Sequence, residues 1–361
     1  MGVVVYPDRT TRIERSGRSI APASLFSTHA LPANERFDAW HESMDVFLSS
    51  SLNSDGEIDS FVGEIESYLI DDVMLSRGIA SRQKYDRPIA KIATDGLDHY
   101  MIQVFLDGGC TLRLRDRDVQ SLPGQAIAFD LGEVMDSFNT GFDVLCLVVP
   151  RTRLAPLLSL PDNLHGSIPD PESGVGKMLA DFISSFYLVA PKLNPGEAQG
   201  AVRALLEMIA AAYNGATTHD VMAGIEGQNA LLLSAQAFIR HNIAIDLTPA
   251  QIAQGVGVSR TSLYRLFEPI GGVAGYVRDL RLRRCFADLI SLRHAGLQVS
   301  EIAYKWGFTD ASHFTRIFQQ RFGHKPSEVR PKSSSLMHRD RTALDPRVGD
   351  RRYEEWITTL A

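Results

Sequence analysis

The stretch LQVSEIAYKWGFTDASHFTRIF, residues 297–318, repeats the plan of an earlier stretch, LTPAQIAQGVGVSRTSLYRLF, residues 247–267. Small and apolar residues recur in the same order, and the agreement resumes after one inserted residue. Such self-similarity predicts two copies of one supersecondary unit. The matched pairs are Leu247 with Leu297, Ile252 with Ile302, Ala253 with Ala303, Gly257 with Gly307, Leu263 with Phe314, Arg265 with Arg316, and Phe267 with Phe318.

Each copy carries the signals of a helix, a tight turn and a second helix. In the first copy Thr248 can cap the helix, Pro249 suits its first position, and Gln251 completes a capping box. Gly257 and Gly307 can adopt the positive φ that ends a helix and turns the chain. This is the helix-turn-helix plan. The remaining signals are Gln298 with Glu301 at the second copy's start, and Ser259 and Asp310 as acceptors at the start of the second helices.

The second helix of each copy has an apolar face and a polar face. Leu263 with Phe267, and Phe314 with Phe318, fall four residues apart and anchor the helices inward. The opposite faces suit double-stranded DNA, because Arg binds guanine or phosphate, Ser, Thr and His bind either, and methyl groups pack against thymine. The candidate DNA contacts are Arg260, Thr261, Ser262, Tyr264 and Arg265 in the first copy, and Ala311, Ser312, His313, Arg316 and Gln320 in the second.

Charge is distributed unevenly along the chain. The 361 residues carry a net charge of -6, but residues 240–330 contain 13 Lys and Arg against 7 Asp and Glu. This asymmetry indicates a basic module attached to an acidic domain. A solvated basic face would give the same count, so charge alone does not identify a nucleic-acid binder.

The stretch IAYKWGFTDASHFTRIFQQRFGHKPSEVR, residues 302–330, resembles the signature of the AraC/XylS family of bacterial transcription regulators, and YVRDLRLRRCFADLI, residues 276–290, resembles that family's connecting helix. The chain departs from the pattern at Cys285, where the family usually has Ala, and in the shorter loop FEPIGGVAGY. The resemblance implies that the connecting helix holds both units on one DNA face, where they read major-groove segments about 34 Å apart. It assigns DNA contact to Thr261, Tyr264, Arg265, Ser312, His313 and Arg316.

Short strands dominate the pattern between residues 61 and 150, separated by Asp-Gly-Gly and Pro-Gly turns, which predicts a barrel or sandwich. Within it, FLDGGCTLRLRDRDVQSLPGQAIAFDL, residues 105–131, and VVPRTRL, residues 148–154, resemble the cupin-like ligand-binding domain of many family members. The expected fold is therefore α+β and multidomain: an N-terminal cupin-like β-barrel with flanking helices, then an all-α domain with two helix-turn-helix units. The predicted strands are residues 61–70, 99–109, 110–120, 126–131 and 142–150.

We predict neither a metal nor another cofactor in this barrel. Metal-using cupins need clustered ligands, whereas His99 and His165 stand alone in the sequence, as hydrogen-bonded structural histidines commonly do. A barrel mouth is a common site for a small apolar molecule, so we expect an effector, although the sequence does not identify the residues that bind it. Cys110, Cys146 and Cys285 are scattered and are interpreted as buried free thiols.

Helices are predicted on either side of the strands. One follows an Asn34 cap, and two more occupy residues 175–213, the second starting at Asn194, Pro195 and Glu197. By resemblance this helical pair dimerises, and packing onto the barrel is the alternative. The apolar stripes are Phe37, Trp40, Met44, Phe47 and Leu48; Val175, Met178, Leu179, Phe182, Ile183 and Phe186; and Val202, Leu205, Leu206 and Ile209.

These patterns divide the chain into five parts. We expect an irregular segment over residues 1–30, an effector-binding and dimerisation domain over 31–215, and a flexible linker over 216–228. A DNA-binding domain follows over 229–332, and a mostly disordered tail over 333–361. The sequence shows neither an export signal nor a membrane-spanning apolar run, which predicts a cytoplasmic protein.

The leading hypothesis is an effector-responsive regulator that binds promoter DNA as a homodimer. By family resemblance, it activates transcription through contact with RNA polymerase. Two alternatives remain open. One is a cupin-type enzyme targeted to DNA, although the chain has neither a Gly-x-Ser-x-Gly elbow nor a His-carboxylate metal set. The other is a DNA-binding protein whose N-terminal domain only dimerises.

Overall fold

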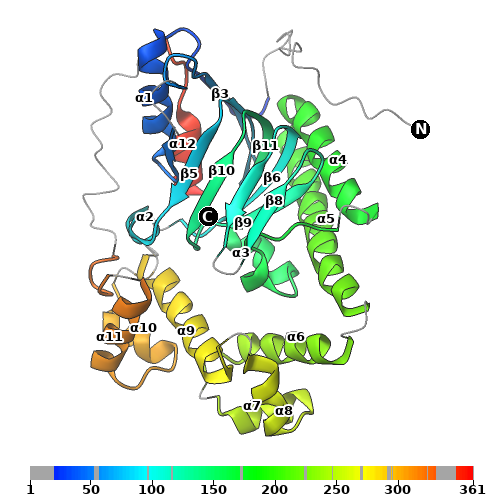
Figure 1. The fold of residues 1–361 in the computed structure, drawn as a ribbon, viewed down its shortest axis with the longest axis vertical. Helices are drawn as coiled ribbons and strands as arrows, with labels where there is room; N and C mark the ends of the chain where they lie inside the picture. The colour runs from blue at the N-terminus through cyan, green and yellow to red at the C-terminus, as the bar shows by residue number, and fades with distance from the viewer. Residues whose placement is uncertain are drawn as a thin grey trace.

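The computed structural model describes residues 20–52, 57–95, 97–114, 117–170, 174–222, 226–245, 247–268, 271–290, 294, 296–322, 324–330 and 347–360. They form two parts (Figure 1). The sandwich domain comprises the described residues of 20–222 together with residues 347–360. The helical domain comprises the described residues of 226–330. The predicted α+β organisation is thus confirmed.

Antiparallel strands of the sandwich domain form two sheets within the described ranges. One has six strands in the order β1-β3-β4-β11-β6-β9, and the other has five in the order β2-β5-β10-β7-β8. The strands are β1 Ala23–Ser27, β2 Ser49–Ser51, β3 Gly63–Ile70, β4 Val73–Ala80, β5 Gln83–Arg87, β6 Tyr100–Asp107, β7 Cys110–Arg113, β8 Asp118–Ser121, β9 Ala126–Asp130, β10 Met135–Asn139 and β11 Phe142–Val149.

The inner faces of both sheets supply one apolar core, which includes Phe105 and Val144 from one sheet and Leu112 and Tyr85 from the other. The sequence predicted β3, β6, β9 and β11, but it treated 110–120 as one strand, whereas the chain turns between β7 and β8. It also missed β1, β2, β4, β5 and β10. Some of these carry polar residues that alternate in burial, such as QKYDR in β5, so their apolar signal is weak.

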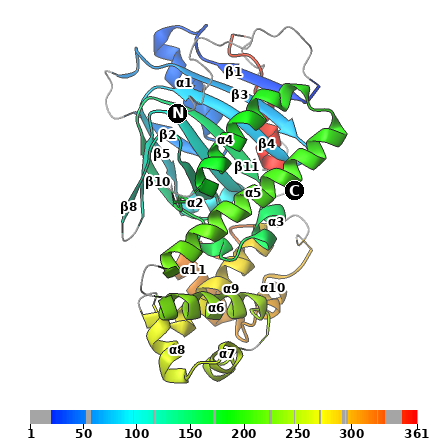
Figure 2. The ribbon, with the colours of Figure 1, turned by 90° about the vertical axis from the view of Figure 1, so that its right-hand side faces the viewer.

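Helices α4 (Gly174–Val189) and α5 (Pro195–Met222) cover the outer face of the six-stranded sheet, as Figure 2 shows. The predicted α5 start is confirmed, because Asn194 Oδ1 accepts hydrogen bonds from the amides of Gly196 and Glu197 at 3.0 Å. The α5 stripe Val202, Leu205, Leu206 and Ile209 is buried. The α4 stripe is partly wrong: Met178 is 55% exposed and Val175 38% exposed, because the helix turns Gly176 and Ala180 toward the sheet instead.

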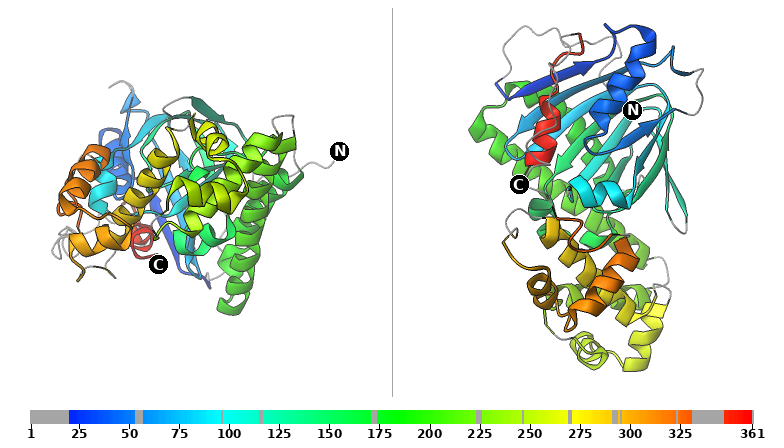
Figure 3. Two further views of the ribbon diagram at one scale, coloured as in Figure 1. Left: turned by 90° about the horizontal axis from the view of Figure 1, so that it is seen from below. Right: turned by 90° about the vertical axis from the view of Figure 1, so that its left-hand side faces the viewer.

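Two segments far apart in sequence close one side of the sandwich. Helix α1 (Ala33–Met44) and helix α12 (Arg352–Thr359) lie side by side there (Figure 3) and contribute Trp40 and Tyr353 to the inner core. The predicted Asn34 cap is wrong, since Pro32 precedes the first turn. Phe47 and Leu48 are buried as expected, but they follow the end of the helix.

Several predicted irregular regions are ordered. Within the segment 1–30, β1 is a strand of the large sheet, and residues 1–19 lie outside the described residues. In the predicted linker 216–228, α5 continues to Met222 and α6 begins at Glu226, while 223–225 lie outside. In the tail 333–361, residues 347–360 fold onto the sandwich, because Tyr353 and Ile357 form an apolar stripe that the many charges conceal. Residues 331–346 and 361 lie outside.

The helical domain has two apolar cores, one for each helix-turn-helix unit. Helix α9 runs between the units and contributes Leu280 to the first core and Phe286 to the second. Its helices are α6 Glu226–His241, α7 Pro249–Val256, α8 Arg260–Phe267, α9 Val273–Ile290, α10 Val299–Lys305 and α11 Ala311–Phe322. The short helices of the sandwich domain are α2 Ile89–Asp95, α3 Arg151–Leu154, and the 3-10 turns Ala155–Leu157, Pro161–Asn163 and Ala190–Lys192.

Candidate DNA-binding surface

The first helix-turn-helix unit consists of α7 and α8. Thr248 and Gln251 form the predicted capping box around Pro249, and Gly257 ends α7 in the left-handed conformation with φ 72°. Ser259 Oγ then accepts a hydrogen bond from the Ser262 amide at 3.1 Å and caps α8. These local signals, all visible in the sequence, fix the angle at which α8 leaves the turn.

The second unit, α10 and α11, has the same build. Glu301 accepts a hydrogen bond from the Gln298 amide at 2.5 Å, and Gly307 has φ 79°. Asp310 Oδ1 accepts bonds from the amides of Ser312 (2.7 Å) and His313 (3.0 Å). These amides, His313 first, hold the pKa of Asp310 below its usual range, so the carboxylate that starts α11 stays charged at neutral pH.

The interiors of the units correspond as the repeat predicted. Ile252 and Ala253 are buried in one unit and Ile302 and Ala303 in the other. Among the second-helix anchors, Phe267 and Phe318 are fully buried. Trp306 is half-buried, and its Nε1 donates to Asp288 Oδ2 of α9 at 2.7 Å. The aromatic residues near the second turn therefore hold α11 in place.

Every predicted contact residue lies on an accessible side of its helix. Tyr264, for example, is 49% exposed although it is aromatic. The hydroxyl oxygens of Ser262 and Ser259 are also hydrogen-bonded to each other at 2.9 Å, so Ser262 is part of the α8 cap as well as of the surface. The exposed residues are Arg260, Thr261, Tyr264, Arg265, Ser312, His313, Arg316 and Gln320, and the half-buried ones are Ser262 and Ala311.

Arg281 of α9 fastens the two units together. Its guanidinium donates to the carbonyls of Ile243 (3.3 Å) and Ile245 (2.6 Å), at the end of the segment before α7, and to the carbonyl of Gly307 (3.2 Å), in the turn of the second unit. A planar guanidinium suits such divergent acceptors. The spacing between α8 and α11 therefore depends on a side chain that touches neither helix face.

A groove of about 330 Å³ lies between the units and is lined from both sides. Arg278 of α9 and His313 of α11 both line it, and Arg278 is exposed. The candidate list from the sequence omitted Arg278. The sequence feature that could have indicated Arg278 is the basic run from Arg278 to Arg284. In this run, only the residues that face away from both cores remain open to solvent.

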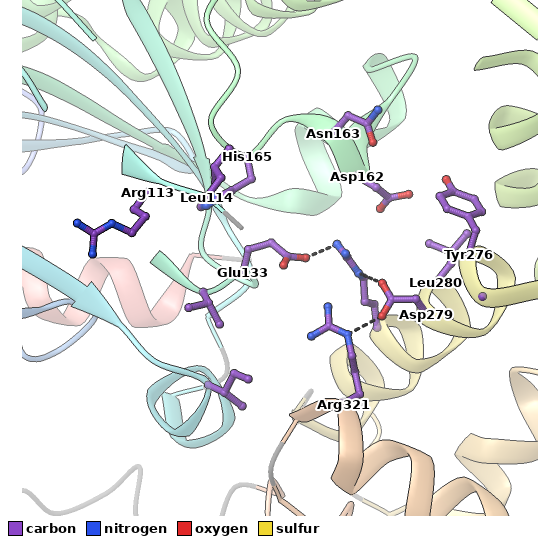
Figure 4. A pocket seen from close by; sticks show the side chains of 14 residues that line it. Arg113, Leu114, Glu133, Asp162, Asn163, His165, Tyr276, Asp279, Leu280 and Arg321 are labelled. Atoms are coloured by element: carbon purple, nitrogen blue, oxygen red, sulfur yellow. Dashed lines mark hydrogen bonds and ion pairs between the residues drawn. The ribbon is translucent and has the colours of Figure 1, made fainter. Parts of the chain in front are cut away.

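The sandwich and helical domains meet at a cleft of about 660 Å³ (Figure 4), to which Glu133 and Asp162 contribute from one side and Tyr276, Asp279 and Arg321 from the other. Polar contacts between described residues cross the boundary in at least two places. Arg283 of α9 pairs with Glu133, and Arg240 of α6 donates to the Ser159 carbonyl at 2.5 Å. Ile92 of α2 also enters the core of the second unit.

The sandwich interior contains a cavity of about 70 Å³ between the sheets. Its walls include Trp40 and Met44 of α1, Phe142 and Cys146 of β11, and Tyr353 of α12. Polar groups come from Ser76, Gln103 and Asn139, and among the described lining residues none is charged.

The two histidines considered in the sequence have structural partners. His99 Nε2 donates to the Ile357 carbonyl at 3.2 Å, and His165 Nδ1 accepts from the Asp130 amide at 3.1 Å. Burial lowers the pKa of both. Over the ranges that the structure describes, His, Cys, Asp and Glu do not gather in threes as a metal site would require. Cys110 and Cys285 are buried free thiols, while Cys146 is a half-buried one.

Family comparisons agree with this architecture. Residues 31–212, half of the chain, match the AraC-binding-like domain, and residues 252–332 match a helix-turn-helix domain. The chain belongs to the AraC/XylS family. The predicted family resemblance is thereby confirmed, and the sandwich domain corresponds to the family's cupin-like domain. Residues 347–360 lie beyond both matched regions.

Relatives within the AraC/XylS family are regulators. The transcriptional activator NphR of a Rhodococcus species is 23% identical over 256 residues, covering 69% of this chain and 75% of NphR. The activator RhaS of Enterobacter sp. strain 638 is 29% identical over 111 residues, so the chain spans only 40% of its length. The crystal structure of the AraC-like transcriptional activator CuxR is 26% identical with a TM-score of 0.50, covering 73% of this chain and 96% of CuxR.

Within the described residues, none of the helices combines the length and the apolar character needed to cross a bilayer.

Proposed function

We propose that this protein is a transcription regulator that binds promoter DNA through α8 and α11 together. The observation that carries the proposal is the pair of similar helix-turn-helix units, each with a buried apolar face and an open polar face on its second helix. The activator relatives support regulation of transcription as the outcome.

Residues on the two helices divide by chemistry. Arg265 and Arg316 occupy equivalent positions in the repeat and suit guanine or phosphate, while Thr261, Ser312 and His313 suit base edges or phosphate. Arg278 in the groove between the units suits a phosphate. With Arg281 fixing the spacing, one chain would contact two successive major-groove segments about 34 Å apart.

Fluorescence anisotropy with labelled duplexes tests this function. The probe is the region upstream of the protein's own gene, and the comparison is a shuffled duplex of the same composition at physiological salt. We expect preference for the natural sequence by about 10³-fold or more. The double variant Arg265→Ala/Arg316→Ala should lose the preference. Equal affinity of the unmodified protein for both duplexes contradicts the proposal.

Effector response is the second part of the proposal. The cavity between the sheets is the best candidate site, since its apolar wall with a few amide and hydroxyl groups suits a small, neutral, largely apolar molecule. Such a molecule regulates DNA binding only if it binds one domain arrangement better than another. A screen of melting temperature against neutral metabolites tests this part, and a panel without any shift favours a domain that serves dimerisation alone.

Dimer formation and contact with RNA polymerase complete the proposal. The outer side of α4 exposes Met178, Leu188 and Val189, an apolar strip that suits a second copy of the chain. Sedimentation of the wild type against Met178→Glu measures this, with a shift to monomer expected. Transcription in vitro with purified polymerase distinguishes activation from repression.

A further inference from the structure

The C-terminal segment, residues 347–360, is built into the sandwich domain. The Ser27 amide donates to the Val348 carbonyl at 2.9 Å, and the Asp350 amide donates to the Leu25 carbonyl at 2.8 Å. These bonds attach the segment to β1, the edge strand of the six-stranded sheet. The chain therefore leaves the sandwich for the helical domain and later returns to it.

Helix α12 seats this segment in the core. Tyr353 and Ile357 are buried beside Phe26 and Trp40. The Tyr353 hydroxyl donates to Ser43 Oγ, which in turn donates to Glu354 Oε1 at 2.5 Å, because Ser43 has a single hydroxyl proton. Paired hydroxyls of this kind define one position for the helix.

Tyr353 is also a wall of the interior cavity. At about 70 Å³ the cavity is far smaller than the roughly 300 Å³ of even a modest ligand site. Close packing leaves little other space, so a molecule can enter only if a wall moves. The wall that moves must be one whose displacement leaves both sheets intact.

Most walls are fixed by strand pairing. The strands that contribute Met101, Phe142 and Cys146 pair with neighbours on both sides. Helix α1 is followed along the chain by β2, which pairs with β5. Helix α12, in contrast, belongs to neither sheet, and the described segment that carries it is held to β1 by the two backbone hydrogen bonds of Val348 and Asp350. It can separate from the cavity without breaking any pairing inside either sheet.

We propose that residues 347–360 form a releasable strap that closes the cavity, and that its release admits a small, neutral, largely apolar ligand. Along the chain the strap follows the second helix-turn-helix unit, so an effect of strap release on DNA binding is expected at that unit. Val329 and Arg330 are the attachment on that side: Val329 is buried in the second unit's core, and Arg330 donates to the Leu297 carbonyl. This consequence at the DNA rests on the proposed function; closure of the cavity does not.

The native thiols provide the test. Cys146 lines the cavity, whereas Cys110 and Cys285 are buried elsewhere, in the sandwich and in the helical domain. Cys146 is half-buried, and desolvation at the cavity wall raises the pKa of its thiol to about 12, so the closed form should react slowly. Alkylation by iodoacetamide is followed at each cysteine by mass spectrometry in the full chain. The test variant is Ile357→Ala, and the matched control is Thr358→Ala, an exposed neighbour on the same helix.

We expect Ile357→Ala to accelerate alkylation at Cys146 by about tenfold, because loss of buried packing favours local opening. Cys110 and Cys285 should keep their rates, and Thr358→Ala should match the wild type. Fluorescence of neutral N-phenyl-1-naphthylamine should rise with the Cys146 rate, while anionic anilinonaphthalene sulfonate should not follow it. Equal binding of the anionic dye overturns the ligand class.

A wild-type rate at Cys146 in Ile357→Ala, with faster hydrogen exchange in α12, overturns the strap as the closing element. If all three thiols react faster, Ile357→Ala unfolds the domain, and the decision passes to Tyr353→Phe, which removes only the hydroxyl contact with Ser43. A Cys146-specific rise in that variant supports the strap, and a rate equal to wild type overturns it. Since none of these measurements involves DNA, they can fail independently of the proposed function.

Discussion

Arg283 of α9 pairs with Glu133 of the sandwich domain, so this guanidinium is one of the contacts that join the two domains. The same guanidinium contacts Asp279 at 2.9 Å, and Asp279 contacts Arg321 of α11 at 2.5 Å. The charges form a continuous row from the loop after β9 to the helix that carries Arg316. A rearrangement of the sandwich domain near Glu133 therefore changes the ion pairs that hold α11 in position.

The Glu133–Arg283 pair should couple the domains measurably. In a double-mutant cycle of Glu133→Gln, Arg283→Met and both changes, we expect a coupling energy of about 1 kcal/mol, since partly exposed pairs are screened. Hydrogen exchange in α2, which packs against the second unit, supplies the readout. Additive effects of the two substitutions would show that the contact does not hold the domains together.

Arg316→Ala should weaken operator binding while leaving the fold intact. Arg316 is exposed on α11, and loss of a base or phosphate contact costs about 1–3 kcal/mol. Arg265→Ala, at the equivalent place in α8, should act in the same direction. Arg82→Ala removes a similarly exposed charge from the sandwich and serves as the control in the same anisotropy titration. Unchanged affinity in Arg316→Ala means that the helix faces are assigned wrongly.

Local signals explain why the helical domain was predictable. Capping residues, turn glycines and the four-residue spacing of apolar anchors act within a dozen residues, and Thr248, Gly257, Gly307 and Asp310 all behave as their sequence context indicated. Once the buried face of each second helix is known, its exposed face is the opposite one. The fastening by Arg281 and the groove beside Arg278 join segments far apart in the chain, so local pattern alone could not reveal them.

The sandwich domain was less predictable because its elements depend on distant partners. β5 has the polar sequence QKYDR and is held between β2 and β10. The buried Arg87 in it is satisfied by Asp95 and by the carbonyls of Phe47, Leu97 and Leu131. The C-terminal segment has the composition of a charged tail, and it folds only because the core of the sandwich domain buries Tyr353. In both cases tertiary contacts outweigh composition.

The two turn glycines should respond differently to alanine. Both have positive φ, but at Gly257 a Cβ would meet open space, whereas at Gly307 it would lie 2.8 Å from Arg281 Cζ. Gly257→Ala should cost about 1 kcal/mol from the left-handed conformation alone. Gly307→Ala should cost about 1 kcal/mol more, because the displaced guanidinium loses carbonyl partners.

Urea unfolding followed by circular dichroism measures both glycine variants. Gly275→Ala is the control, since it lies inside α9 with open space around it and should stabilise by about 0.5–1 kcal/mol. Equal losses at Gly257 and Gly307 would contradict the role given to Arg281.

Phe318→Ala should unfold the second unit. Its fully buried ring lies 4.6 Å from that of Phe322 and 5.4 Å from that of Phe314, between centroids. Removal of a buried Phe costs about 3–5 kcal/mol. Tyr264→Ala removes a comparable but exposed ring from α8 and should change the free energy of unfolding little. A small effect of Phe318→Ala would mean that α11 is seated by other contacts.

Asp279 should make stability depend on pH. Burial alone would raise the pKa of Asp279, but the guanidiniums of Arg283 and Arg321 outweigh it and hold the pKa below its ordinary value of 3.8. A carboxyl with a lower pKa in the folded chain stabilises the fold above the unfolded pKa. That contribution is lost as pH falls through the folded pKa, because the proton must then be accepted.

Asp279→Asn should therefore lower the free energy of unfolding at pH 7, by about 1 kcal/mol after screening of these partly exposed pairs. The difference from wild type should hold down to pH 3.8 and shrink below it as the wild-type carboxylate takes up its proton. Urea titrations at several pH values measure it. Glu268→Gln, an exposed carboxylate at the end of α8, is the control and should leave stability nearly unchanged. If the Asp279→Asn difference stays constant as pH falls well below this value, the arginines do not hold the carboxylate in its charged form.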